Sequence, residues 1–392
     1  MIGAPRSLEN AMAGYKLFSS DSHVSEPPDL WTKRIDKRFR FRAPYVETRE
    51  RDGKLLDYMI YEGFAPHPVS IGLAAATKDG DRGEFHIRAS RYEDALPGGW
   101  DPVARLKDQD VDGVDGEVLH PTLGFRMFWL KDADLQRAVF RAYNEWLGEY
   151  ISHDRRRLIG LALISICDIA SAVGDMERAV RLGHKGIMIA LSPPADRPYS
   201  SQEYDPLWAK AQELGLPIVL HAITGAAESR LGLAYWNSEM ILYPVLRHHE
   251  MDRTLAHLLL SGVLERFPRL QIVSAENEIG WIPQSLSRLD NAMSFGTRAL
   301  EVSVWPTKLS LKPSEYFRRQ VHVGFIDEPE AIPMRHQIGV DNLMWASDYP
   351  HFASTWPKSR AFVERVTSGV DSDEKRKLVR DNCLRLFNLR EN

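Results

Sequence analysis

A chain of 392 residues with 44% hydrophobic content can bury the core of one large barrel or of two ordinary domains. Its formal net charge of −4, without a long run of Lys or Arg, argues against nucleic acid as a partner. The two cysteines, Cys167 and Cys383, lie far apart, which argues against a disulfide framework and against a cysteine-based zinc site.

Short apolar runs along the chain predict eight strands. Most of the runs are apolar without alternation, which is typical of strands buried on both faces, and their length and flanking residues favour strands over buried helix segments. In chain order the runs cover residues 15–23, 114–122, 158–165, 186–191, 216–222, 270–276, 321–326 and 343–348.

Segments with helical spacing lie between these runs. Asp168 is suited to an N-cap and Gly183 to a helix end, and the helix that they bound is one of a series. Helices are predicted over 132–154, 168–183, 204–215, 238–266, 278–294, 328–338 and 358–388. Alternating strands and helices are the pattern of a (β/α)8 or TIM barrel, an α/β fold. An open doubly wound sheet is the main rival, but no glycine-rich phosphate turn follows the first strand.

Residues 24–113 separate the first two strands by more than one crossover, so we expect an insertion within a single domain covering 1–392. The segment includes charged and glycine-rich clusters such as KDGDRGEF (78–85). Because it leaves the C-terminal end of the first strand, it could lie over the barrel mouth as a lid or a partner interface. A solvated decoration is the alternative interpretation.

Polar residues gather where the predicted strands end. They are Asp21, Ser22 and His23 after strand one, His120 after strand two, His221 after strand five, Glu276 and Asn277 after strand six, and Ser347, Asp348 and His351 after strand eight. The C-terminal ends of barrel strands converge on one mouth, so we expect these residues to meet there. Each also has a structural interpretation, such as a turn cap for Asp21 or Asp348 or a core histidine for His120.

Four of these residues form a nitrogen and oxygen donor set. Asp21 and His23 are two positions apart on one strand and point to the same side, and His221 and Asp348 join them at the mouth. The set suits a divalent ion, with Zn²⁺ as first choice and Mn²⁺ or Fe²⁺ as alternatives. Such an ion lowers the pKa of bound water and polarises a carbonyl group, and Asp348 is also placed to accept a proton from that water.

Several motifs together resemble the amidohydrolase superfamily, in the branch typified by aminocarboxymuconate-semialdehyde decarboxylase. They are DSHVSEPPDLW (21–31), HPTLGF (120–125), PIVLHA (217–222), GVLERFPRLQIVSAENEIGWIPQSLSRLD (262–290) and WASDYPH (345–351). The resemblance covers nearly the whole chain outside the insertion. It implies a metal-dependent barrel in which Asp21, His23, His221 and Asp348 match the family's ligand positions, and it implies a homodimer.

The sequence departs from the family pattern at two positions. Decarboxylases of the branch have a histidine at the end of strand six, where this chain has Glu276. Binuclear members carry a bridging lysine at the end of strand four, whereas Lys185 stands at the other end of that strand, so no lysine bridge is expected. Glu276 is interpreted as a general base, as a further ligand that would permit a second ion, or as an acid that opens the next helix.

The site predicts an enzyme, with a metal-dependent hydrolase as the first hypothesis. Metal-bound water, deprotonated by Asp348 or Glu276, would attack an amide, ester, thioester or activated C–C bond of a bulky or aromatic substrate. The alternative hypothesis is a nonoxidative decarboxylase of an aromatic or enol carboxylic acid. An inert binding protein on the same scaffold is a third hypothesis, disfavoured because all four ligand residues are in place.

Further residues near the strand ends have two interpretations each. His120, His351 and Glu26 could donate a proton or orient the substrate, or they could be hydrogen-bond partners of the ligands. The aromatic residues of AYWN (234–237) and Trp356 could wall the pocket or pack under loops. The N-terminus lacks an apolar core of signal-peptide length, and no stretch approaches 18 apolar residues, so we expect a cytoplasmic protein without membrane contact.

Overall fold

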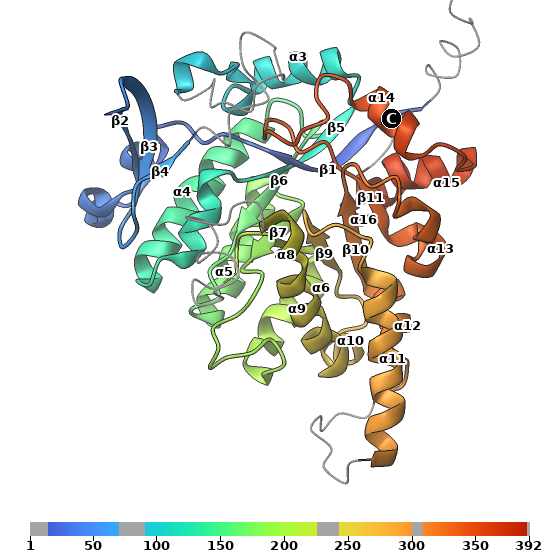
Figure 1. Ribbon diagram of the computed structural model, residues 1–392. Coiled ribbons are helices and arrows are strands. Elements are labelled where there is room, and N and C mark those ends of the chain that lie inside the picture. Colours follow the sequence, from blue (N-terminus) through green and yellow to red (C-terminus); the bar gives the residue numbers. More distant parts are fainter. Residues whose placement is uncertain (1–14, 70–90, 226–242, 300–308, 390–392) are drawn as a thin grey trace, which may run out of the picture.

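Parallel strands form the centre of the molecule and curl into a nearly closed barrel, with helices around its outside (Figure 1). The protein is seen in a computed structural model that describes residues 15–69, 91–225, 243–299 and 309–389. The eight strands are hydrogen-bonded in the order β1 (Phe18–His23), β5 (Gly116–His120), β6 (Leu158–Leu163), β7 (Gly186–Ile189), β8 (Ile218–His221), β9 (Ile272–Ala275), β10 (Val321–Phe325) and β11 (Leu343–Trp345). Each predicted run contains one of these strands, which confirms the (β/α)8 barrel.

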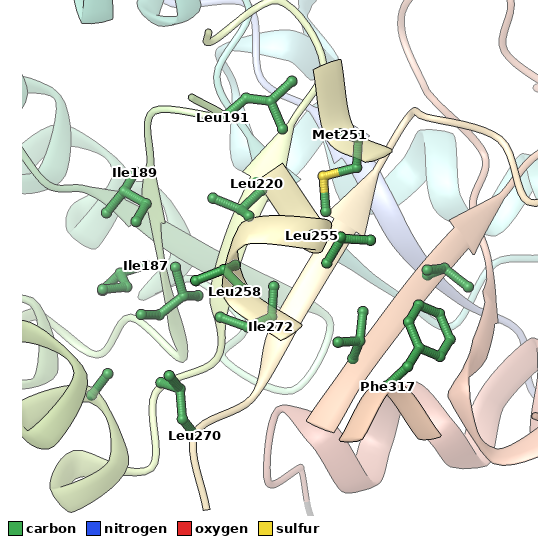
Figure 2. Close-up of a cluster of buried hydrophobic side chains, with 14 of the residues drawn as sticks. Ile187, Ile189, Leu191, Leu220, Met251, Leu255, Leu258, Leu270, Ile272 and Phe317 are labelled. Carbon is green, nitrogen blue, oxygen red and sulfur yellow. The ribbon is translucent and has the colours of Figure 1, made fainter. Parts of the chain in front are cut away.

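The barrel strands are buried on both faces, and alternate side chains enter different clusters. In β8, Ile218 and Leu220 pack on the outside of the barrel, whereas Val219 belongs to the cluster that includes Val273. Figure 2 shows the outer layer, in which strand residues Ile187, Leu220 and Ile272 face Met251, Leu255 and Leu258 of α9 (His248–Leu260). Successive side chains of a strand point to opposite faces, so His221 shares the inner face with Val219. The strand pattern therefore aims this imidazole into the barrel.

The first three predicted barrel helices are present with bounds close to those expected. They are α4 (Ala133–Ile151), α5 (Ile169–Leu182) and α6 (Asp205–Leu214). The side chains of Asp132 and Asp168 accept backbone N–H groups at the starts of α4 and α5, and Gly183 ends α5 with a left-handed φ of 95°. The glycine ends α5 three residues before β7 begins at Gly186.

Two of the later predicted segments, 238–266 and 358–388, are divided into shorter pieces in their described parts, whereas 278–294 corresponds to one long helix, α11 (Ile282–Ala299). In order the shorter helices are α8 (Tyr243–Leu246), α9, α10 (Val263–Arg266), α14 (Ser359–Val366), α15 (Ser372–Arg376) and α16 (Asn382–Leu386). Gly369, with a φ of 77°, separates α14 from α15, and Asp371 caps the start of α15. Within the described ranges, no helix is long and apolar enough to cross a membrane.

One helical prediction is wrong, and one helix was missed. The segment 328–338 is not one helix, because only α13 (Arg335–Ile338) is α-helical, and the preceding Ile332–Met334 forms a 3-10 turn around Pro333, which lacks a backbone N–H. The helix α12 (Pro313–Gln320) was not expected. Proline at its first position and Glu315 near its start are both helix-start signals, so the sequence does contain the information.

The described part of the segment 24–113 contains a small sheet, two α-helices and short 3-10 turns. The α-helices and strands are α2 (Leu30–Arg34), the antiparallel strands β2 (Tyr45–Arg51), β3 (Lys54–Ile60) and β4 (His67–Pro68), and α3 (Pro102–Asp112). Figure 1 shows the small sheet to one side of the barrel, while α3 leads directly into β5 as the first barrel helix. The stretch 78–85 lies outside the described residues, and the role of this segment as a lid or partner interface stays a prediction.

Candidate active site

Side chains from the ends of distant strands meet at the barrel mouth, as the sequence predicts. Potential ligand atoms lie within 4.8 Å of one another in two groups that share His23. One group is Asp21, His23 and His221, and the other is His23, Asp348 and His351. All of these residues are buried. Residues more than 300 positions apart in the chain therefore share one small polar volume inside the barrel.

His23 is held with one ring nitrogen facing two carboxylates. Its Nδ1 lies 2.7 Å from the carbonyl oxygen of Pro121. Because a carbonyl oxygen only accepts, this contact places the proton on Nδ1 and leaves Nε2 with a lone pair. That Nε2 atom lies 3.2 Å from Asp21 Oδ1 and 3.1 Å from Asp348 Oδ1. The backbone thus fixes the tautomer that a metal ligand requires.

His221 repeats this arrangement from the opposite side of the site. Its Nδ1 lies 2.7 Å from its neighbour Ala222's carbonyl oxygen, and its Nε2 lies 3.3 Å from Asp21 Oδ2. The same reasoning places the proton on Nδ1 and the lone pair on Nε2. Two imidazole lone pairs therefore point toward the carboxylate of Asp21.

The donor atoms of this set lack hydrogen-bond partners, and this tests whether a metal ion fits. Four such buried atoms are Asp21 Oδ1, His23 Nε2, His221 Nε2 and Asp348 Oδ1. With both imidazoles neutral, as metal ligands must be, all four are acceptors that face one another without a hydrogen between them, which is costly in a buried site unless a cation lies among them. Two carboxylates and two imidazoles also match the donor preferences of Zn²⁺, Mn²⁺ and Fe²⁺. The residues fit a divalent cation.

The electrostatics of the site favour positive charge among these atoms. Burial disfavours charge on the His23 imidazole, but the facing carboxylates of Asp21 and Asp348 raise the pKa of His23 to about 10, so without an ion a proton on Nε2 supplies the positive charge that a metal ion would supply when bound. Burial would likewise raise the pKa of Asp21, yet the imidazoles of His120 and His221 hold that pKa well below its usual range. Asp21 is therefore a carboxylate at neutral pH, and the position that faces it attracts a cation.

The backbone around Asp348 is held in a rare conformation. Its φ of 56° is left-handed, which for a residue with a side chain costs free energy and is concentrated at functional sites. His351 lies against this carboxylate, with its Nδ1 3.0 Å from Asp348 Oδ1 but outside hydrogen-bond geometry, and its Nε2 lies 2.9 Å from Thr122 Oγ1. Its ring also stacks on His23 at a centroid distance of 3.7 Å. These contacts support the interpretation of His351 as a partner of a ligand.

His120 lies in the same volume as a neutral imidazole. Its Nε2 is 3.2 Å from the carbonyl oxygen of Ser20 and 3.5 Å from Asp21 Oδ1. Burial lowers the pKa of His120 to about 3, although Asp21 opposes this effect. His120 therefore carries no charge at neutral pH, and its Nδ1 is a buried atom without a hydrogen-bond partner.

Glu276 lies at the edge of the site and is held by an arginine. Its Oε2 is 3.7 Å from His221 Nε2, and its Oε1 accepts a hydrogen bond from Arg247 at 2.5 Å. Arg247 also pairs with Glu278, and both glutamates have left-handed φ angles, of 56° and 53°. Glu276 belongs to neither group of clustered ligand atoms. The sequence alone does not predict the pairing of Arg247 with Glu276, because Arg247, between α8 and α9, comes near the end of β9 only in the folded chain.

Glu26 acts on the loop after β5. Its fully buried carboxylate accepts backbone N–H groups at the start of the 3-10 segment Leu123–Trp129, at 2.9 and 2.8 Å. Phe125 of this segment lies against the His221 ring, with centroids 4.3 Å apart. Glu26 therefore positions an apolar wall of the site. The sequence analysis did not single out Phe125, because its neighbour His221 is distant from it in the chain.

We expect Glu26→Ala to lower the free energy of unfolding by about 3 kcal/mol, because buried N–H groups lose their acceptor. Urea denaturation of the purified variant measures this loss. Glu26→Gln retains one acceptor oxygen and should lose less. If Glu26→Ala unfolds within about 0.5 kcal/mol of the wild type, the carboxylate does not hold this loop.

Aromatic side chains in two places were proposed to line the pocket, and the structure describes only one of them, Trp356. Trp356 donates its indole N–H to the carbonyl oxygen of Asp108 at 3.2 Å and packs against Tyr349, with ring centroids 5.4 Å apart. It therefore packs against α3 and Tyr349, in line with the structural alternative of a packing role. The segment 234–237 lies outside the described residues.

Comparisons with known proteins place the chain among similar barrels. A family model described as Amidohydrolase matches residues 67–389. The 2-amino-3-carboxymuconate-6-semialdehyde decarboxylase of Dictyostelium discoideum is 23% identical over 254 residues, which cover 64% of this chain and 67% of that protein.

Two solved structures share the fold. An amidohydrolase of Mycobacterium avium subsp. paratuberculosis superposes with a TM-score of 0.77 at 24% identity, covering 95% of this chain and 99% of that one. A 5-carboxyvanillate decarboxylase mutant from Novosphingobium aromaticivorans, with bound manganese and 3-methoxy-4-hydroxy-5-nitrobenzoic acid, has a TM-score of 0.69 at 20% identity, covering 96% and 98%. At these identities the likeness shows a common barrel.

Proposed function

This chain belongs to the amidohydrolase family, and from that membership we propose that it is a metal-dependent, nonoxidative decarboxylase of an aromatic or enol carboxylic acid. The observation that carries the proposal is the set of four buried acceptor atoms that face one another at the barrel mouth. The names of the Dictyostelium relative and the Novosphingobium structure support decarboxylation over hydrolysis, which the sequence put first.

Asp21, His23, His221 and Asp348 would hold one divalent cation. When bound there, the cation supplies positive charge that attracts a substrate carboxylate and an adjacent hydroxyl oxygen and stabilises negative charge on them. The donor set accepts several first-row ions, and the manganese of the Novosphingobium structure makes Mn²⁺ the ion to load first. We propose a single ion, because one oxygen of Glu276 already accepts a hydrogen bond from Arg247.

The reaction breaks the bond between the carboxylate and its ring or enol carbon. CO₂ leaves, the electron pair stays on that carbon, and a proton must then be added to it. Glu276 is our candidate for the group that delivers this proton, which its carboxylate would first take from water or from the substrate hydroxyl, because its second oxygen lies at the edge of the ligand cluster, 3.7 Å from His221 Nε2. Arg247 holds the other oxygen and so fixes the direction of the carboxyl group. Phe125 gives the ring an apolar surface beside His221.

The test is an assay in D₂O with Mn²⁺-loaded protein and a panel of phenolic acids that includes 5-carboxyvanillate and 2,6-dihydroxybenzoate. We expect release of CO₂ from a member of the panel and one deuterium on the carbon that carried the carboxylate. The His221→Ala variant is the control and should release none. Metal-loaded wild-type protein that releases no CO₂ from any acid of the panel would contradict the proposal.

Hydrolysis is the second candidate, and Glu276 is the observation that favours it. A carboxylate at the end of strand six, where decarboxylases of the branch have histidine, is suited to accept a proton from an attacking water. Assays in ¹⁸O-labelled water separate the two reactions. Hydrolysis of an ester or amide places ¹⁸O in the acid product, whereas decarboxylation leaves the remaining ring product without it.

A further inference from the structure

The barrel has a seam beside the proposed metal site. The strands β1 and β11 stand at the two ends of the hydrogen-bonded order, and the bonds between them follow no regular ladder. The backbone N–H of Asp348 donates to the Asp21 carbonyl oxygen at 2.9 Å, and the backbone N–H of His23 donates to the Tyr349 carbonyl oxygen at 2.6 Å. Serine hydroxyls on both sides add further bonds. Three of the four proposed ligands therefore sit on the two sides of this seam.

Arg105 of α3 reaches both sides of the seam from within the core. The side chain is 0% exposed, and one terminal nitrogen donates to the His23 carbonyl oxygen at 2.7 Å. The other terminal nitrogen lies 3.5 Å from the Tyr349 carbonyl oxygen, and the guanidinium group lies over the Tyr349 ring, 4.4 Å from its centroid. The guanidinium group of Arg105 thus contacts the backbone of His23, which is one proposed ligand, and of Tyr349, which directly follows the ligand Asp348.

The charge of Arg105 is balanced by Glu117 of β5. Its Nε donates to Glu117 Oε2 at 2.6 Å, and Gln109 donates to the same oxygen at 2.6 Å. A buried ion pair adds little stability compared with a well-packed apolar core, so stability alone is a weak reason for this arrangement. A guanidinium group offers several donors in one rigid plane, which a lysine does not. This geometry suits a residue that fixes two backbone segments relative to each other.

We propose that Arg105 is a positioning residue for the metal site, which sets the spacing of the His23 and Asp348 ligand atoms by clamping the two edges of the seam. The inference rests on the proposed binding of a divalent cation, and it holds for either candidate reaction. The helix α3 lies at the end of the segment 24–113. The proposal gives this helix a role in holding the metal site, which differs from the expected role of the segment as a cover over the barrel mouth.

The test measures metal affinity directly. Arg105→Lys keeps a positive charge beside Glu117, but one ammonium group cannot serve Glu117 and both carbonyl oxygens. We expect its Kd for Mn²⁺, measured by titration calorimetry, to rise between about tenfold and a hundredfold, the range found when partners of metal ligands are removed. The visible absorption spectrum of the Co²⁺-loaded variant should also change, because the ligand spacing changes.

Asn382→Ala is the matched control. Asn382 is fully buried and clamps the carbonyl oxygens of Val340 and Leu343, each at 2.8 Å, at the opposite end of β11. It should lower stability while the Mn²⁺ Kd and the Co²⁺ spectrum stay as in the wild type. If Arg105→Lys does not fold, the variant Arg105→Met with Glu117→Gln removes both charges and keeps an acceptor for Gln109.

The outcomes separate this inference from the proposed function. Wild-type protein that binds no divalent cation contradicts the metal site itself. Wild-type protein that binds Mn²⁺, together with arginine variants of unchanged Kd and Co²⁺ spectrum, overturns the role of Arg105 alone. An equal loss of affinity in Asn382→Ala would also overturn it, because the effect would then follow from general destabilisation.

Discussion

His221→Ala and Asp348→Ala should each abolish stoichiometric metal binding and reduce turnover to the uncatalysed rate, while the barrel stays folded. Each substitution removes one of four donors from a buried set, and the metal affinity should fall by more than the roughly hundredfold loss seen for partners of ligands. The His221 Nε2 and Asp348 Oδ1 atoms have no hydrogen-bond partner among the described residues, so removing either one leaves the hydrogen bonds of the barrel in place. Elemental analysis of the purified variants, with circular dichroism as a check on folding, measures the result.

His322→Ala is the control for these ligand variants. His322 is also a buried histidine on a barrel strand, but it lies near the N-terminal end of β10 and contacts Gln271 Oε1 at 2.8 Å. We expect it to lose stability and to keep its metal content. Metal content at the wild-type level in either ligand variant would contradict the proposed site, whatever the activity shows.

The sequence predicts the fold well because the strands carry their own signals. Runs such as 216–222 are short, apolar and bounded by turn residues, and helices with capping residues, such as α4 and α5, lie beside several of them. The helices after 300 are harder to predict, since Pro333 interrupts one and α12 is too short to show a full amphipathic pattern. Their ends depend on packing as well as on local preference.

The candidate ligands also follow from the sequence, because the ends of parallel barrel strands converge by geometry. The residues that orient them do not. Nothing local in the sequence connects Arg105 with the His23 carbonyl, Arg247 with Glu276, or Glu26 with the loop after β5. Such contacts join segments that the fold alone brings together, and the tautomers of the two imidazoles depend on carbonyl groups in the same way.

Glu276→Gln should lower turnover by about a hundredfold or more while metal content stays unchanged. A glutamine cannot transfer a proton, and a positioned acid or base contributes about 10²- to 10⁴-fold to a reaction. The side chain of Glu276 belongs to neither cluster of ligand atoms, so its loss should leave the metal donors in place. Steady-state assays of CO₂ release in H₂O and D₂O, with metal analysis of the same samples, measure the effect.

Two further variants test the proton transfer itself. Glu276→His restores a side chain that exchanges protons at the position where related decarboxylases have histidine, so it should retain more decarboxylation than Glu276→Gln. Glu278→Gln is the matched control, because Glu278 shares Arg247 with Glu276 but contributes no atom near His221 in the described contacts. Its turnover should fall less than about tenfold, the smaller effect expected of an indirect change. If Glu276→Gln keeps wild-type turnover and deuterium incorporation, the proton reaches the substrate carbon from another group.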